Sequence, residues 1–306
     1  MLKRDIAIVG CGPIGALMAN LLAARGIGVI VIERAPDVYQ LPRAIGMDDE
    51  IMRVFQAAKL EAVNTERVYT LRGMDLLRRN RSHLRRISIE HQPVTLGHPI
   101  FTLFHQPTLE ANIRKGLNRF PELADVRLGH EVRDIRDLGD RIELDFGPTD
   151  TEQTETVSAQ YVLGCDGGRS TVRRCFNVTQ EDLGLHQPWV VVDAIMKRPI
   201  ETTGFAEQIC DPKRPSTFIP APEPRKRWEF MVMPGDDQDE LVTPEKLNEL
   251  IRPWASPDDY EIERAVIYTF HALIARQWRM GKTGRAFILG DAARPMPSLP
   301  GPCMSP

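Results

Sequence analysis

The sequence predicts an α/β fold in which a Rossmann-like nucleotide-binding domain is interrupted by a β-rich segment. Three observations support this prediction. An apolar, strand-like run leads directly into the glycine pattern Gly10-x-Gly12-x-x-Gly15. A second apolar run, residues 29–32, follows a helical stretch and ends in an acid. From about Trp189 onward, β-rich segments with long connections take over, which is typical of a sheet packed beside the first domain.

The N-terminal glycine turn has a physical role for each of its residues. Gly10 permits a tight turn, Gly12 lets the backbone approach a pyrophosphate, and Gly15 lets the helix pack closely on the strand. Pro13 and Ile14 open that helix, whose N-terminal N–H groups and partial positive charge favour phosphate. We therefore expect these five residues to bind a dinucleotide.

An acid follows at the tip of the second strand. Glu33 stands about 23 residues after Gly10, close to the spacing of an acid that accepts hydrogen bonds from a ribose diol. A carboxylate there repels a 2′-phosphate, so the adenosine end is that of FAD or NAD rather than NADP. Arg34, its neighbour, is included in the predicted cofactor site.

The same stretch has an alternative interpretation as a targeting segment. Residues 6–24 carry no charge and follow Lys3 and Arg4, which is also typical of a signal peptide or membrane span. Three glycines, Pro13 and Asn20 interrupt the run, and a strand-like segment follows at once. We therefore favour the nucleotide site and expect no membrane association.

The overall composition is that of a globular protein. The chain has 306 residues, is 42% hydrophobic and 26% charged, and carries a formal net charge of −3. No nucleic-acid partner is expected, and the basic cluster at 78–86 is interpreted as a solvated loop, with an anion-binding patch as the alternative. Five cysteines without a C-x-x-C pair argue against a disulfide framework and a structural metal, so a cytoplasmic location fits.

The chain after the first motif alternates between helical and strand patterns. A helical pattern ends near Leu60, residues 68–99 look irregular or strand-like, and a helix is expected from about 104 to 120, with Pro107 in its first turn. Short strands are expected at 126–128, 132–136 and 141–146.

Two later strands end in glycine and an acid. The run 160–163 leads into Gly164-Cys165-Asp166-Gly167 and a helix, and the run 285–289 ends in Gly290-Asp291. Between them lie the expected β segments 189–196, 216–220, 227–233 and 262–270, with a short helix at 245–254. We interpret this order as a β-rich segment inserted between two stretches of one α/β domain.

Three motifs at strand ends carry a resemblance to a known family: the first glycine turn, Asp166-Gly167-x-x-Ser170-x-x-Arg173, and Gly290-Asp291. An NAD dehydrogenase needs only the first, whereas a flavin extends well beyond the pyrophosphate. In this order they resemble the class A flavoprotein monooxygenases, the aromatic hydroxylases of the p-hydroxybenzoate hydroxylase type. Segments 42–50, 165–174, 210–215 and 228–235 resemble the 3-(3-hydroxyphenyl)propionate hydroxylase subgroup.

The resemblance implies a Rossmann-like FAD-binding domain with an inserted β-rich substrate domain. The FAD-binding domain would comprise 1–70, 101–185 and 276–306, with 71–100 as a substrate-side insertion and 186–275 as the substrate domain. FAD would be the resident cofactor and NAD(P)H the co-substrate. Dioxygen and reduced flavin would form a hydroperoxide that hydroxylates a phenolic aromatic acid, while the protein orients the reactants and excludes water.

The resemblance also implies roles for individual residues. Glu33 and Gln106 would hold the AMP half of FAD, Arg43 would lie near the cofactor, and Gly290 with Asp291 would bind the ribityl–pyrophosphate region. A further acid, Asp166, would serve the motif shared between FAD and NAD(P)H handling.

The catalytic residue is not assigned by the sequence. A base near the hydroxyl of a phenol would help the reaction, and His271 is a candidate, although a lone histidine after a strand is more often packed or hydrogen-bonded. Phe230 and Met231 could line a ring pocket, but neighbours on a strand face opposite ways.

The C-terminal stretch departs from the family pattern. Family members follow Gly-Asp-Ala-Ala with His and later open a long helix with Gly-x-Gly-x-Asn. Here Arg294 stands in place of the His, Gly301 matches the first glycine, and Cys303 takes the place of the second. We expect a C-terminally truncated member, with a catalytically silent FAD- or nucleotide-binding remnant as the alternative. The oligomeric state is not predicted.

Overall fold

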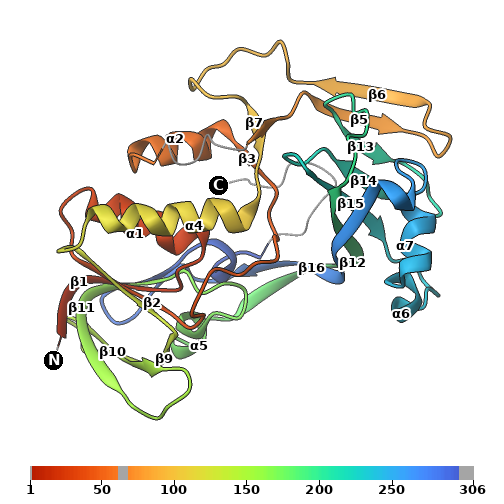
Figure 1. The fold of residues 1–306 in the computed structure, drawn as a ribbon. Coiled ribbons are helices and arrows are strands. Elements are labelled where there is room, and N and C mark those ends of the chain that lie inside the picture. Colours follow the sequence, from red (N-terminus) through yellow and green to blue (C-terminus); the bar gives the residue numbers. More distant parts are fainter. Residues whose placement is uncertain (1, 61–67, 296–306) are drawn as a thin grey trace.

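The computed structural model of the chain describes residues 2–60 and 68–295, which form two large sheets and one small one (Figure 1). An eight-stranded, mostly parallel sheet forms one part, and a seven-stranded, mostly antiparallel sheet forms the other. The predicted fold class, an α/β nucleotide-binding fold with a β-rich part, is confirmed.

The parallel sheet puts the ends of its central strands at one edge. Six of its strands run in the order β17, β18, β11, β1, β2, β8, and the last five of these are parallel to one another. The other two, at residues 130–137 and 142–148, are antiparallel and join the sheet through β11. The bounds are β1 (Leu2–Val9), β2 (Val29–Glu33), β8 (Ala124–Leu128), β11 (Glu155–Gly164), β17 (Arg279–Met280) and β18 (Ala286–Ile288).

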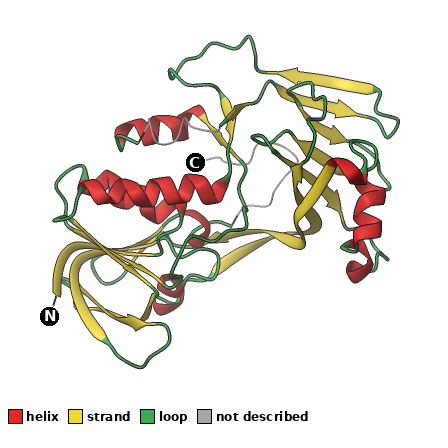
Figure 2. Ribbon diagram, viewed as in Figure 1, coloured by secondary structure: helices red, strands yellow, loops and turns green. Residues whose placement is uncertain are grey.

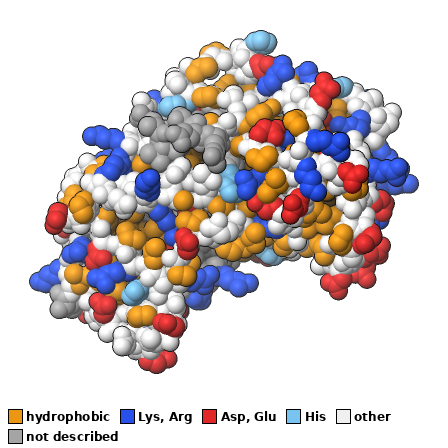
Figure 3. Space-filling view, in the orientation of Figure 1, with side chains coloured by type: hydrophobic (Ala, Val, Ile, Leu, Met, Phe, Trp, Pro, Cys, Tyr) orange, Lys and Arg blue, Asp and Glu red, His pale blue; other side chains and the backbone are white. Residues whose placement is uncertain are grey.

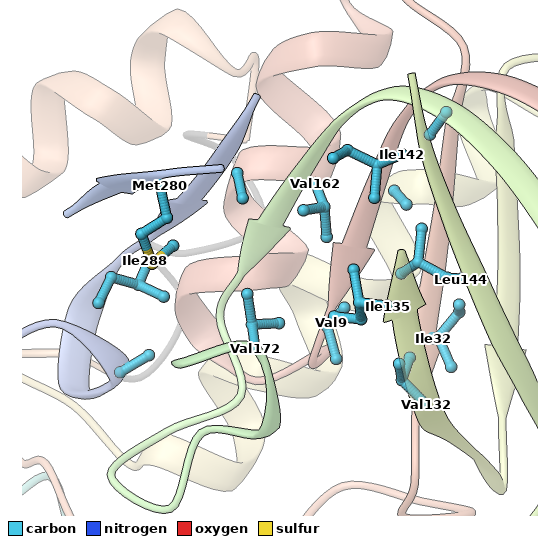
Figure 4. Packing of buried hydrophobic residues seen from close by; sticks show 14 of the residues in the cluster. Val9, Ile32, Val132, Ile135, Ile142, Leu144, Val162, Val172, Met280 and Ile288 are labelled. Atoms are coloured by element: carbon cyan, nitrogen blue, oxygen red, sulfur yellow. The ribbon is translucent and has the colours of Figure 1, made fainter. Parts of the chain in front are cut away.

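Both faces of this sheet are covered, which explains why residues 6–9 of β1 and 29–32 of β2 are all apolar. Helices α1 (Pro13–Ala23) and α4 (Gln106–Gly116) lie over one face, and β9 (His130–Asp137) and β10 (Ile142–Pro148) cover the other (Figure 2). Figure 4 shows the second interface, where Val9 and Ile32 of the sheet pack with side chains of β9 and β10.

The uncharged N-terminal run is therefore divided between a strand and a helix of the sheet domain. In the described ranges, no helix is long and apolar enough to cross a membrane. Acidic and basic side chains are interspersed on the face shown in Figure 3, as expected for a net charge of −3.

The second sheet has the strand order β16, β12, β15, β14, β13, β5, β6. Helix α7 (Pro244–Ile251) packs on one of its faces against Trp228 and Phe230, with α6 (Gln238–Leu241) beside it. The bounds are β5 (Gly73–Leu77), β6 (His83–Ser88), β12 (Gln180–Met196), β13 (Ala206–Ile209), β14 (Ser216–Ile219), β15 (Arg225–Met231) and β16 (Tyr260–Ala275).

Smaller elements complete the fold. A three-stranded sheet of β3 (Gly46–Asp48), β7 (Phe101–Leu103) and β4 (Tyr69–Thr70) lies beside α2 (Asp49–Ala57). Helix α5 (Thr171–Cys175) follows β11, and single 3-10 turns are η1 (Leu117–Arg119), η2 (Pro257–Asp259) and η3 (Gly290–Ala292).

Two local predictions need correction. The basic cluster is only partly a loop, because its second half forms β6 and Arg86 pairs with the buried carboxyl of Asp75 through two hydrogen bonds of 2.7 and 2.8 Å. The long ribbon of the second sheet also begins at Gln180, before the expected start near Trp189. The five domain ranges remain predictions.

Candidate cofactor site

Three loops begin side by side at the carboxyl edge of the parallel sheet. The ends of β2, β1, β11 and β18 are joined there by backbone hydrogen bonds of 2.7–2.9 Å, from Gly10 N to Ile32 O, Cys165 N to Val9 O, and Leu289 N to Gly164 O. Ligands of open α/β sheets bind outside this edge. The glycine turn, the Asp166 loop and the Gly290-Asp291 loop therefore surround one region.

The glycine turn is shaped by close backbone approach. Gly10 has φ +98°, and a Cβ on it would lie 2.5 Å from the carbonyl oxygen of Cys165; a Cβ on Gly15 would lie 2.0 Å from the carbonyl oxygen of Gly10. At Gly12, by contrast, a Cβ would meet no atom of residues 2–60 and 68–295 within 4 Å. Gly10 and Gly15 are therefore required by the packing of the protein itself, whereas the space beside Gly12 is open for a ligand.

The N-terminus of α1 is left for a ligand to cap. Gly12 is its N-cap and provides no side-chain hydrogen bond, and Pro13 opens the helix. The first N–H groups of a helix have no partner within it. The amides of Ile14 and Gly15 are consequently placed to donate to an anion such as a pyrophosphate.

Glu33 braces the glycine turn. Its Oε2 accepts a hydrogen bond of 2.7 Å from the Cys11 amide, and its Oε1 accepts one of 2.8 Å from the Ala35 amide. Each carboxylate oxygen has a further lone pair, so the acid can also accept from a ribose hydroxyl. Arg34 is exposed.

Arg114 supports the glycine turn through a hydrogen bond to its backbone, a role that the sequence did not indicate. Its Nε donates to the Cys11 carbonyl at 2.8 Å, and its Nη2 donates to Glu110 Oε1 at 2.7 Å. Glu110 and Arg114 are four residues apart on α4, a spacing at which an acid and a base pair on one helix face. The spacing of Glu110 and Arg114 was therefore the sequence signal from which this ion pair could have been predicted.

The Gly290-Asp291 loop contacts the start of α1. Gly290 has φ +59°, and a Cβ on it would lie 3.0 Å from Ile14 Cγ1. Asp291 is open to solvent, but the protein atoms around its carboxyl raise its pKa, while the positive charge of Arg43 lowers it. Asp291 thus stands on the same side of the sheet as the glycine turn, close enough to Arg43 to interact with it.

Arg43 belongs to a loop that is held from both parts of the molecule. Gln106 Oε1 accepts hydrogen bonds from the amides of Arg43 and Ala44, at 2.7 and 2.8 Å. Arg227 of β15 donates to the carbonyls of Arg43 and Pro42, both at 3.0 Å. Gln106 therefore has a structural task that the sequence did not indicate.

Asp166 caps α5 and leaves one oxygen without a partner. Its Oδ2 accepts hydrogen bonds from the amides of Thr171 and Val172 at 2.6 and 3.1 Å, whereas Oδ1 is buried and has no hydrogen-bond partner within residues 2–60 and 68–295. The guanidinium of Arg173 donates to the carbonyl of Ala292 at 2.9 Å, which links the second loop to the third. A donor on a ligand would satisfy the Oδ1 atom.

These features fit an FAD molecule. The open space at Gly12 and the uncapped helix suit its pyrophosphate, Glu33 suits a ribose, and the unpaired oxygen of Asp166 suits a hydroxyl donor. Asp291 would accept from the ribityl chain. Among residues 2–60 and 68–295, no group of three or more His, Cys, Asp or Glu side chains is placed to hold a metal ion.

His271 lies elsewhere in the fold. It is exposed on the β12–β16 ribbon, where its Nδ1 is 2.7 Å from Nδ1 of His186, whose Nε2 is 2.9 Å from an oxygen of Asp182. This arrangement gives the ring a partner within the ribbon. The ring-pocket prediction is resolved by the two faces of the sheet: Phe230 packs toward α7, so Met231 points the other way.

A buried charge cluster joins the second sheet to the Arg43 loop. Arg227 is 2% exposed, and its guanidinium forms hydrogen bonds of 2.7 and 3.1 Å with both oxygens of Asp193. Arg264 contacts the same carboxylate at 2.9 Å. No sequence pattern singled out this cluster, although charged and aromatic residues alternate from Arg227 to Phe230, which indicates a strand with one polar and one apolar face.

The fold and the three loops together are those of an FAD-binding domain. A family model described as an FAD-binding domain matches residues 3–302, so the chain belongs to that family. The C-terminal residues Gly301 and Cys303, noted in the sequence, lie outside the described ranges.

Curated relatives agree with this assignment. The chain is 35% identical over 296 residues to the 3-(3-hydroxy-phenyl)propionate/3-hydroxycinnamic acid hydroxylase of Escherichia coli (strain SMS-3-5 / SECEC), covering 96% of this chain and 51% of the relative. The hydroxylase of the same description from Burkholderia cenocepacia (strain HI2424) is 34% identical, with 96% and 53% covered. The chain therefore spans about half the length of these relatives.

Solved structures show the same fold. The p-nitrophenol 4-monooxygenase PnpA of Pseudomonas putida DLL-E4 superposes with a TM-score of 0.85 at 21% identity, covering 96% of this chain and 74% of that one. Aklavinone-11 hydroxylase, solved with FAD and aklavinone, gives a TM-score of 0.80 at 23% identity, with 97% and 58% covered.

The cysteines beside the site should be unreactive. Burial raises the pKa of the Cys11 and Cys165 thiols to about 12, so neither is a thiolate at neutral pH. Cys210 is exposed. We expect iodoacetamide at pH 8 to label Cys210 in the folded protein and to spare Cys11 and Cys165 until urea is added, as measured by peptide mass mapping. Rapid labelling of Cys11 in the folded protein would contradict the buried turn.

Proposed function

We propose that the chain is an FAD-dependent aromatic hydroxylase, or the FAD-binding body of one, that acts on a phenolic acid with NAD(P)H and dioxygen. The observation that carries the proposal is the convergence of the glycine turn, the Asp166 loop and the Gly290-Asp291 loop at one sheet edge. The substrate class follows from the likeness to relatives described as hydroxylases of 3-(3-hydroxyphenyl)propionate.

The residues of this chain would bind and orient rather than react. Bound FAD would supply hydride acceptance from NAD(P)H and the activation of dioxygen. The α1 amides would hold its pyrophosphate, Glu33 its ribose and Asp291 its ribityl chain. The loop held by Gln106 and Arg227 would fix Arg43 beside Asp291.

A second candidate is an FAD-binding protein that does not hydroxylate by itself. The chain's coverage of about half of its curated relatives is the observation that favours it. The two candidates differ in a simple assay with added FAD. A hydroxylase oxidises NADH or NADPH faster when 3-(3-hydroxyphenyl)propionate is added and releases a hydroxylated product. An FAD-binding remnant is yellow but shows no stimulation, and a colourless chain that takes up no FAD contradicts both.

Replacing Asp291 should separate cofactor binding from stability. A raised pKa means that folding penalises the charged carboxylate, so Asp291→Asn should slightly raise the free energy of unfolding at pH 7, by about 0.5 kcal/mol or less because the residue is exposed. The difference in stability should shrink as the pH becomes acidic, because protonation of the wild-type carboxyl relieves the penalty. FAD affinity should fall about tenfold or more because the charged acceptor is lost.

Urea unfolding and FAD fluorescence titration measure the two effects. The exposed Asp150, replaced by Asn, serves as the matched control and should change neither. FAD affinity equal to wild type in Asp291→Asn would remove Asp291 from the proposed site.

A further inference from the structure

One face of the second sheet looks toward the nucleotide-binding part. Arg227 lies on this face, because its guanidinium reaches the carbonyls of Pro42 and Arg43. Its chain neighbour Trp228 points to the opposite face, against α7. Side chains alternate along a strand, so Glu229 and Met231 lie on the same face as Arg227.

Cross-strand pairing orders this face into rows. Glu229 pairs with Thr217 on one side and Val191 on the other, and Thr217 pairs in turn with Gln208. Directly paired residues carry their side chains on the same face. One row further along, Met231 pairs with Trp189 and Trp189 with Tyr268, which makes an apolar, aromatic row. Glu229 thus stands between the charged Arg227 row and this aromatic row.

Among the described residues, none donates a hydrogen bond to the carboxyl of Glu229, which is largely buried although its oxygens are not sealed from solvent. The residue is 8% exposed, and its nearest cation is the Nη1 of Arg227 at 3.9 Å, beyond hydrogen-bond distance. Asp193, not Glu229, takes the hydrogen bonds of Arg227 and contacts Arg264. Thr217 donates its hydroxyl to Gln208 at 2.8 Å rather than to Glu229. Burial raises the pKa of the Glu229 carboxyl, with Arg227 acting against it.

A largely buried carboxyl without a protein donor is stabilised by a ligand that donates a hydrogen bond to it. We propose that Glu229 is a substrate-contacting residue that accepts a hydrogen bond from the hydroxyl of the phenolic substrate, whose ring lies against the row of Met231 and Trp189. The carboxyl of Glu229 repels a second carboxylate, so the acid group of the substrate points away from Glu229. This inference rests on the proposed function, because it assumes a phenolic acid.

Two ligands that differ only in the hydroxyl test the contact: 3-(3-hydroxyphenyl)propionate and 3-phenylpropionate. Calorimetric titration of the FAD-saturated protein gives both dissociation constants. In the wild type the hydroxylated ligand should bind about 10- to 100-fold tighter, the range for a hydrogen bond to a charged group. In Glu229→Leu the ratio should fall to about twofold or less, while the affinity for 3-phenylpropionate is retained or improved.

Two further variants keep the test sharp. Glu229→Gln preserves the shape and accepts a neutral hydrogen bond, so its ratio should be about 3- to 10-fold, which decides the matter if the leucine variant does not fold. Glu261→Gln, an exposed acid on β16, should keep the wild-type ratio. A ratio that is unchanged in both Glu229 variants, or near one in the wild type, overturns the role of Glu229 alone. A wild type that holds FAD but binds neither ligand overturns the phenolic-acid function as well.

Discussion

Gly15→Ala should abolish the stable fold, whereas Gly12→Ala should leave the fold intact and weaken FAD binding. The added Cβ at Gly15 would lie 2.0 Å from the carbonyl oxygen of Gly10, a backbone atom that cannot move without opening the turn. We expect a loss above about 4 kcal/mol in the free energy of unfolding, a size reached only by a few severe mechanisms. An added Cβ at Gly12 would meet no described residue within 4 Å, so the change in the free energy of unfolding should stay within about 0.5 kcal/mol.

The added methyl at Gly12 instead occupies the space assigned to the pyrophosphate. FAD affinity should therefore fall about tenfold or more, about 1.4 kcal/mol of binding free energy. Urea unfolding and FAD fluorescence titration give the two quantities, with Asp150→Asn as the control. A Gly12→Ala protein that binds FAD like the wild type would place the pyrophosphate elsewhere, and a Gly15→Ala protein of wild-type stability would contradict the close contact between helix and strand.

Asp193→Ala should be the most damaging change in the second sheet. Asp193 pairs with the buried Arg227 and the partly buried Arg264, and its removal leaves Arg227 with only the more distant Glu229, at 3.9 Å, as a counter-charge. Breaking a buried ion pair on one side costs about 3–5 kcal/mol. Because Arg227 also holds the Pro42 and Arg43 carbonyls, we expect FAD affinity to fall together with the free energy of unfolding.

The double variant Asp193→Leu/Arg227→Met distinguishes the effect of the ion pair on stability from the effect of the hydrogen bonds that Arg227 donates to the Arg43 loop. Removing both charges leaves Arg264 and Glu229 as the opposite charges of the cluster, so the double variant should be more stable than Asp193→Ala, as measured by urea unfolding. It should still bind FAD more weakly than the wild type, because the Arg43 loop has lost its donor. A double variant less stable than the sum of the single losses would show that Arg227 stabilises the sheet in some other way.

The sequence predicted the strands and turns whose signals are local. The first βαβ unit is marked by apolar runs and by glycines whose spacing follows from backbone geometry, and the structure shows why Gly10 and Gly15 must lack side chains. The Gly290-Asp291 turn was recognisable because a strand leads into it. The contact between this turn and Ile14 could not be predicted locally, because it depends on the parallel arrangement of β1, β11 and β18 in the folded sheet.

Other parts of the site were hidden because their role depends on distant partners. Gln106 was expected to contact the AMP half of FAD, yet its oxygen holds two amides of the Arg43 loop. An arginine is usually expected at the surface. Arg227 is instead buried and links the two parts of the molecule, because it hydrogen-bonds to Asp193 and to the Pro42 carbonyl, which are distant in the sequence. Charge alternation along β15 shows that two faces exist, but not which of them meets the other domain.

The most direct measurement is a titration of FAD into the purified chain, followed by flavin fluorescence, with ADP as a competitor. If three loops bind one extended nucleotide, binding saturates at one FAD per chain, ADP competes for the glycine turn, and the single substitutions Gly12→Ala and Asp291→Asn both weaken the complex. A chain that binds no FAD, or whose FAD affinity is indifferent to both substitutions, would contradict a shared flavin site at this edge of the sheet.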